Sequence, residues 1–169
     1  MTSDKTNMIG LYFLLIASIM ANFVPVGAIQ MLGLVLGLVM IIAAYVYRMR
    51  ASLNSLSYSH STFLITTFWV GSFLLLIGLI VAVIWVYLQG NHAAIYNMMD
   101  SLHKGVVINE YDTRLILETY IQANMPILIL SAICTLGPGV LYFIYRLGAG
   151  LLRVLKNEHM PYPAAWFKI

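Results

Sequence analysis

A chain of 169 residues with 62% hydrophobic and 9% charged side chains has a composition that a water-soluble domain cannot accommodate. Soluble proteins carry about 25% charged residues, and a fold of this length has too little interior to hide so much apolar surface. The net charge of +3 does not indicate nucleic-acid binding, because the basic residues stand at the ends of apolar segments. The composition predicts an all-α integral membrane protein, with 1–169 as a single membrane domain.

Four apolar segments are predicted to cross the membrane, since a spanning helix needs about 20 apolar residues. Pro25 and Gly27 join the first two segments into a helical hairpin, because proline breaks a helix and glycine tolerates a turn. A cleavable signal peptide is not expected, because no small-x-small cleavage site follows the first apolar run. The four predicted spans are residues 8–24, 28–47, 63–88 and 126–146.

The segment between the second and third spans, residues 51–60, is rich in Ser and Asn and too polar to cross a membrane. Leu53, Leu56 and His60 recur in it at near-helical spacing. We therefore expect this segment to lie along the cytoplasmic membrane interface, with His60 at the surface.

Residues 91–125 are predicted to form an extramembrane helical hairpin that rests on the membrane surface. Apolar residues at positions 95, 98, 99 and 102 follow the pattern of an amphipathic helix, which Gly105 is expected to close. Asp112 is the expected N-cap of the second helix. Arg114 and Glu118 are spaced to form an ion pair on that helix.

The distribution of lysine and arginine predicts the orientation, because these residues accumulate on the cytoplasmic side. Four spans place seven of the nine basic residues on the side of the two termini and leave Lys104 and Arg114 outside. Both termini are therefore expected to be cytoplasmic, in a bacterial-type inner (plasma) membrane, with residues 147–169 as a cytoplasmic tail. The basic residues assigned to the inner side are Lys5, Arg48, Arg50, Arg146, Arg153, Lys156 and Lys168.

Small residues recur at the spacing by which membrane helices pack closely. Gly33 and Gly37 form a GxxxG motif on the second span, and Gly71 and Gly78 lie on the third. Such positions let helix backbones approach one another. The pattern does not distinguish packing within the chain from dimerisation.

The fourth span contains Gly137-Pro138-Gly139, where proline predicts a kink or local unwinding. Ser131, Thr135 and Pro138 share one face of this helix. A kinked packing helix is the favoured interpretation, because no charged residue lies nearby. The alternative is a pore or substrate site, since broken helices form binding sites in many transporters.

No catalytic, metal-binding or cofactor-binding residue is predicted. The best metal candidates are His92, Asp100 and His103, because Asp100 and His103 lie one helical turn apart. No residue adds a third ligand to this pair at a recognised spacing, and a solvated helix face explains all three. The sequence has no glycine-rich phosphate loop and no haem-attachment motif. The single cysteine, Cys134, excludes an internal disulfide and is expected to be a small buried residue.

Two stretches of the sequence resemble a family of small bacterial four-span membrane proteins of the DUF4870 type, distant relatives of the Tic20 translocon component. The first is Ser59-His60 with Ile65 and Thr67-Phe68-Trp69, and the second is Tyr145-Arg146 with Gly150-Leu151-Leu152 and Met160-Pro161. The resemblance implies four spans with cytoplasmic termini. It implies no catalytic activity.

The sequence thus predicts a non-enzymatic inner-membrane protein, an accessory or scaffolding subunit that acts through helix packing. The alternative is a small transport or protein-translocation component with a broken fourth helix. The expected partners are the lipid bilayer and either another membrane protein or further copies of this chain. No nucleic acid is expected to bind.

Overall fold

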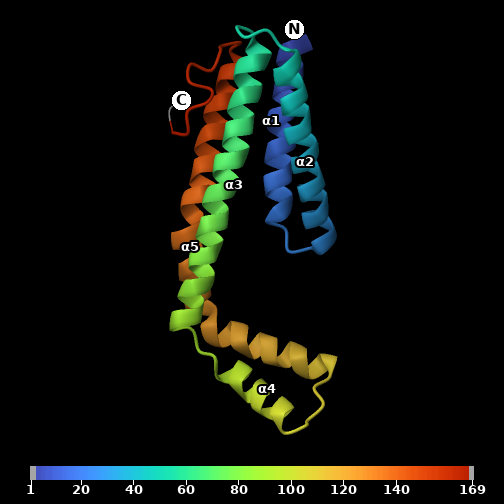
Figure 1. The fold of residues 1–169 in the computed structure, drawn as a ribbon, viewed down its shortest axis with the longest axis vertical. Coiled ribbons are helices and arrows are strands. Elements are labelled where there is room, and N and C mark those ends of the chain that lie inside the picture. The colour runs from blue at the N-terminus through green and yellow to red at the C-terminus, as the bar shows by residue number, and fades with distance from the viewer. Residues whose placement is uncertain (1–2, 168–169) are drawn as a thin grey trace. The chain divides into compact units, whose positions relative to one another are not determined.

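The computed structural model describes residues 3–167, which form five α-helices and no strand (Figure 1). The all-helical prediction is confirmed. The described residues belong to two compact units, one made of residues 3–73 and 140–167 and the other of residues 74–139. Lys168 lies outside the described residues. The helices are α1 (Ser3–Asn22), α2 (Gly27–Arg50), α3 (Leu56–Gln89), α4 (Ala93–His103) and α5 (Glu110–Leu155).

Three helices, α2, α3 and α5, are long and apolar enough to cross a membrane. The shorter α1 is not among them. Its first turns, residues 3–7, and its last residue, Asn22, are polar, so that its apolar part is confined to residues 8–21. That part is shorter than the length of about 20 residues that a bilayer requires. The predicted first span therefore stays a prediction.

In the first unit, α1 and α2 form the predicted hairpin (Figure 1). The hydroxyl of Ser18 donates a 2.7 Å hydrogen bond to the carbonyl of Gly33, which is buried in the interface. A Cβ atom at Gly37 would collide with the same hydroxyl. The GxxxG motif of the second span therefore packs within the chain, because both glycines are in contact with α1.

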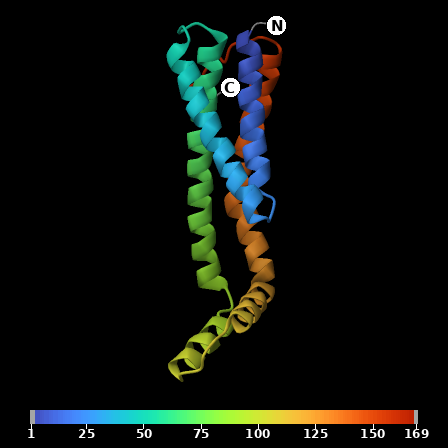
Figure 2. The ribbon, with the colours of Figure 1, turned by 90° about the vertical axis from the view of Figure 1, so that its right-hand side faces the viewer.

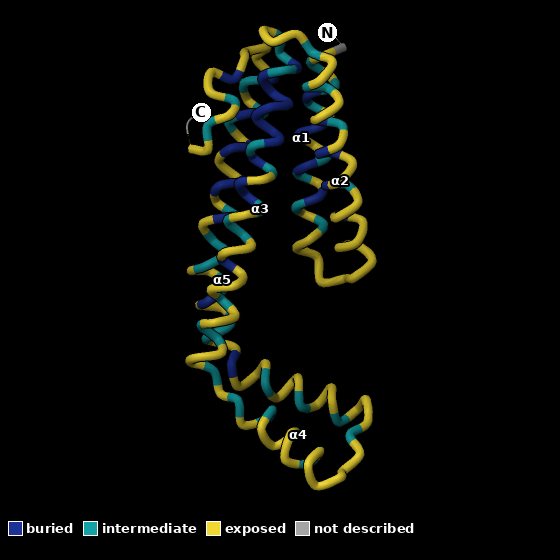
Figure 3. Tube along the Cα trace, viewed as in Figure 1, coloured by how far each residue is buried: buried dark blue, intermediate teal, exposed yellow. Residues whose placement is uncertain are grey.

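The first unit continues with the ends of α3 and α5 that pack on this hairpin, with α1 beside α5 and α2 beside α3 (Figure 2). At Gly150 of α5, a Cβ atom would meet the rings of Tyr12 and Phe63. At Gly71 of α3, it would meet the ring of Phe143. The buried residues of this unit lie on the facing sides of these helices (Figure 3). Glycines thus let aromatic rings fill the spaces between helices.

The third helix begins at Leu56, seven residues before the predicted span. The Ser55 hydroxyl accepts a 3.1 Å hydrogen bond from the backbone N–H of Tyr58, which caps the helix. Residues 51–55 alone connect α2 to α3, and Leu53 is 75% exposed there. His60 is 0% exposed, so the prediction of a surface position for it was wrong.

The second unit contains α4 and the first part of α5, which form a helical hairpin across the predicted residues 91–125 (Figure 1). Gly105 adopts a φ of 76° and ends α4 as predicted. The N–H of Val106 bonds to the carbonyl of Ser101 at 3.0 Å, which completes this turn. The ion pair between Arg114 and Glu118 is confirmed at 3.1 Å.

The N-cap of α5 is Asn109, and the prediction of Asp112 was wrong. The Asn109 side chain accepts a 2.9 Å hydrogen bond from the N–H of Asp112. The Asp112 carboxylate accepts one from the N–H of Asn109 in return. This reciprocal pair is a capping box, in which Asp112 takes the third helical position because its side chain reaches back to the cap.

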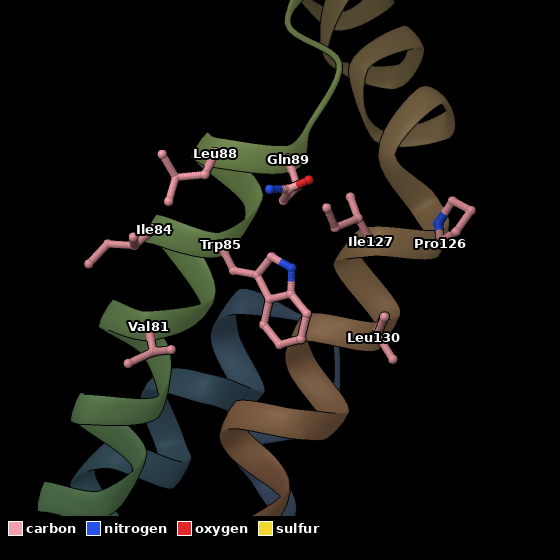
Figure 4. Close-up of a pocket in the computed structure, with 8 residues that line it drawn as sticks. All are labelled: Val81, Ile84, Trp85, Leu88, Gln89, Pro126, Ile127 and Leu130. Atoms are coloured by element: carbon pink, nitrogen blue, oxygen red, sulfur yellow. The ribbon is translucent and has the colours of Figure 1, made fainter.

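The 46-residue helix α5 is continuous through both of its prolines. It bends at Pro126, which begins the apolar part of the helix (Figure 4). A kink or local unwinding was predicted at Gly137-Pro138-Gly139. These residues are helical, so the unwinding is not seen, and the kink stays a prediction. At Gly78 of α3, a Cβ atom would collide with the backbone carbonyl of Thr135, so α3 and α5 pack backbone to backbone there.

Candidate functional site

The most unusual feature of the first unit is Arg146, an arginine that is 0% exposed. The sequence assigns it to the end of the fourth span, where a solvated cation is normal. The structure places it instead against two buried residues of α3, Phe63 and Thr67, which lie one turn apart.

Three hydrogen bonds hold the guanidinium of Arg146. Its Nε donates to Thr67 Oγ1 at 2.9 Å, and its Nη1 donates to the carbonyls of Ala165 at 2.7 Å and Trp166 at 2.9 Å. Its Nη2 is buried without a hydrogen-bond partner within residues 3–167. Arg146 therefore ties α3 and the C-terminal residues to α5.

Aromatic rings and carbonyl dipoles surround the charge of Arg146. Its Cζ lies 4.0 Å from the ring centroid of Phe63 and 5.6 Å from that of Tyr142. The ion pairs within residues 3–167 involve Lys104 with Asp100 and Arg114 with Glu118, not this guanidinium. Cation–π attraction therefore takes part of the role that a carboxylate has elsewhere.

Thr67 is oriented to receive this arginine. Its hydroxyl donates a 2.7 Å hydrogen bond to the carbonyl of Phe63, one turn earlier in α3. A hydroxyl has a single proton, so the Thr67 oxygen is left with lone pairs that face Arg146. The geometry fixes Thr67 as the acceptor in the bond between the two helices.

His60 makes a second set of buried contacts. Its Nε2 lies 2.9 Å from the carbonyl of Glu158, and its Nδ1 lies 2.9 Å from the hydroxyl of Tyr12. A carbonyl can only accept, so Nε2 carries a proton, and in the neutral imidazole Nδ1 then accepts from Tyr12. The imidazole joins α1, α3 and the residues that follow α5.

The C-terminal strap, which we define as residues 156–167, folds back onto the helices because α5 ends in a reversing turn. Asn157 adopts a φ of 61°, and the N–H of Glu158 bonds to the carbonyl of Arg153 at 2.9 Å. Met160 then inserts its side chain, which is 3% exposed, and its N–H contacts Ser59 Oγ at 3.4 Å. The strap is held by Arg146, His60 and Ser59 through its backbone.

The aromatic residues of the quoted stretches lie nearer the surface than these polar residues. Trp69 is 56% exposed, and its Nε1 donates to the Tyr45 hydroxyl at 3.2 Å. Phe68 packs edge-on against Trp69, and Tyr145 is exposed. The quoted stretches thus combine buried residues, polar ones as well as Ile65 and Met160, with exposed aromatic residues.

The candidate pore residues make only local hydrogen bonds. Ser131 donates to the carbonyl of Leu128 at 3.1 Å, and Thr135 donates to the carbonyl of Ser131 at 2.8 Å. A Cβ atom at Gly137 would meet open space. Cys134 is exposed, so the prediction that it is buried was wrong.

The three metal candidates of the sequence do not converge. His103 contacts the carbonyl of Met99 at 2.7 Å, and Asp100 forms an ion pair with Lys104. The ring of His92 stacks on the ring of Tyr120. Residues 3–167 contain no group of three His, Cys, Asp or Glu side chains placed to hold a metal ion.

Sequence reasoning missed Tyr12 and the contact that the strap makes with the helices. Tyr12 is 0% exposed within the apolar part of α1. A phenol in such a segment is a signal, because buried tyrosines usually hydrogen-bond. The strap carries a weaker signal, since its hydrogen bonds to the helices use backbone groups that every sequence has. The side chains of Met160 and Phe167 add apolar contacts.

No family model matches this chain, and neither a curated protein nor a solved structure is significantly similar to it. The resemblance to the Tic20-like family therefore rests on the quoted residues alone.

Proposed function

We propose that this chain is a multi-pass membrane protein that acts as a non-enzymatic accessory or scaffolding subunit through helix packing. The observation that carries the proposal is the open surface of its apolar helices. In α2, α3 and α5, only 22–28% of the most apolar window is buried within the chain. The remaining surface is available to lipid and to a partner helix.

The buried polar groups support a structural role. Both ring nitrogens of His60 are in hydrogen bonds. The three hydrogen bonds of Arg146 join α5 to α3 and to the C-terminal strap. A general base or nucleophile must be able to reach a substrate. These two residues instead make one end of the first unit rigid, as a scaffold requires.

The proposal includes four spans with cytoplasmic termini in a bacterial-type inner membrane, and membership of the Tic20-like family. The distribution of the basic residues supports the orientation. The pairing of α1 with α2 supports a fourth span, because Ser18 and Asn22 use their polar groups on the hairpin itself. The alternative of a transport component has lost its main support, since α5 is unbroken at Pro138.

The test is the particle mass in lipid nanodiscs assembled directly from native membranes, compared with the chain mass of 18.9 kDa. Gly148 on α5 is exposed and has open space where a Cβ would lie, so we expect Gly148→Leu to leave the chain's own packing intact. We expect a stoichiometric complex that Gly148→Leu weakens more than Gly148→Ala does, if a partner helix packs there. A lone chain in these discs, with unchanged mass in all variants, would contradict the accessory role.

A further inference from the structure

The second unit contains a groove that α3, α4 and α5 line together, with a volume of about 510 Å³. This is within the range of about 300–1,000 Å³ that is typical of small-molecule sites. Most of its length is aliphatic. The aliphatic lining includes Leu79, Val83, Val86, Leu128, Ala132 and Leu136.

One end of the groove is aromatic and is centred on His92. The imidazole stacks on Tyr120 with ring centroids 5.9 Å apart and an interplanar angle of 25°. The rings of Tyr87 and Tyr96 lie 5.8 Å and 6.2 Å from it. Four flat rings thus line the place where the aliphatic part ends, and they favour a flat ligand group by stacking.

The hydrogen-bond roles at this end follow from the contacts of His92. Its Nε2 lies 2.8 Å from the carbonyl of Tyr87, so Nε2 carries the proton. In the neutral imidazole Nδ1 is then an acceptor, and the Tyr120 hydroxyl lies 3.5 Å from it, at the limit of a hydrogen bond. A hydroxyl held so weakly is free to turn and donate to a ligand carbonyl.

This end of the groove is also fixed in place. Asn124, which is 2% exposed, accepts a 2.6 Å hydrogen bond from the N–H of Asn91 and donates to the Asn91 carbonyl at 2.9 Å. The residue next to His92 is therefore anchored to α5. A preformed site of this kind needs little reorganisation to bind.

No charged side chain lines the groove. Burying a charged head group there would leave it without a counter-ion, which is costly in an apolar site. The chemistry suits a long hydrocarbon chain joined to an uncharged, flat head that accepts hydrogen bonds. We propose that this groove binds one prenylated quinone, with its ring among His92, Tyr96 and Tyr120 and its chain along α3 and α5. This does not depend on the accessory role.

Binding can be measured with tritiated decylubiquinone and the full chain in phosphatidylcholine nanodiscs, with empty discs as the reference for partitioning. We expect saturable uptake of one probe per chain. Decyl phosphate, which has the same chain length and a charged head, should not compete. Equal uptake by empty discs, or equal competition by decyl phosphate, would overturn the proposal.

A matched pair of substitutions locates the ligand. Leu128 lines this groove, whereas Leu130 lines a different apolar cavity, of about 580 Å³, on the same unit (Figure 4). Leu128→Trp should lower the affinity at least about tenfold by filling the groove, and Leu130→Trp should change it by less than about twofold. A larger loss of affinity in Leu130→Trp than in Leu128→Trp would overturn the placement of the quinone in this groove.

The head-group contact is tested by Tyr120→Phe, which keeps the ring and removes the hydroxyl. The loss of one hydrogen bond should lower the affinity of decylubiquinone about fivefold. This variant also keeps the test valid if Leu128→Trp fails to fold. Unchanged binding in Tyr120→Phe would exclude the proposed head-group contact.

Discussion

The Nε of Arg146 donates a 2.9 Å hydrogen bond to Thr67 Oγ1, and the two residues are 79 positions apart in the sequence. The bond joins α3 to α5 at a place where both residues are 0% exposed. The same guanidinium binds two carbonyls of the C-terminal strap. One side chain therefore couples the packing of two helices to the docking of the strap.

Arg146→Met should release the strap, because the carbonyls of Ala165 and Trp166 lose their donor. A buried carbonyl without a partner costs about 1–3 kcal/mol, so undocking exposes these groups to water instead. We expect faster tryptic cleavage after Lys156 and a lower midpoint of thermal unfolding in detergent. Arg153→Met, on the same helix, is the control and should leave the cleavage rate near that of the parent chain.

Tyr12 and His60 should show energetic coupling, because each is the other's buried hydrogen-bond partner at 2.9 Å. Tyr12→Phe leaves Nδ1 of His60 unpaired, which costs about 1–3 kcal/mol. His60→Leu on the Tyr12→Phe background should then cost less than His60→Leu alone. A double-mutant cycle of unfolding free energies should give a coupling of about 0.5–3 kcal/mol. Strict additivity would show that the bond contributes nothing.

The glycines of α3 and α5 should differ in their tolerance of a methyl group. Gly78→Ala forces a Cβ against the backbone carbonyl of Thr135, which cannot move without shifting α5. We expect a loss of about 1–3 kcal/mol in the free energy of unfolding. Gly71→Ala meets the ring of Phe143, which can rotate away, and should cost less. Chemical denaturation in mixed micelles measures the free energy of unfolding of Gly78→Ala and of Gly71→Ala.

Gly137→Ala is the matched control for these substitutions. Its Cβ would meet open space, so it should be neutral or stabilise the helix by about 0.5–1 kcal/mol. A loss at Gly137 equal to that at Gly78 would indicate a general intolerance of alanine in these helices. The contrast between the two positions therefore tests the packing itself.

The helical class and the long apolar helices could be predicted from composition, because apolar length is a local property. The hairpin at residues 91–125 and the helix end at Gly105 could be predicted for the same reason. His60 and Arg146 could not be placed, since a polar residue beside an apolar run is normally solvated there. The return of the strap helps to bury them, and its hydrogen bonds to both residues use backbone carbonyls, which leave no pattern in the sequence. The helix continues through Pro138, although proline is normally a helix breaker.

Accessibility of introduced cysteines should decide whether α1 spans the membrane. In a chain with Cys134→Ala, four spans predict that Val26→Cys reacts with an impermeant maleimide from outside, and that Ser55→Cys reacts only after the membrane is opened. The apolar part of α1, residues 8–21, is short, so a re-entrant α1–α2 hairpin would protect Val26→Cys from both sides. Tyr111→Cys, in the hairpin of the second unit, should react from outside and serves as the control for vesicle orientation. Reaction of Val26→Cys and Ser55→Cys from the same side would contradict the four-span topology.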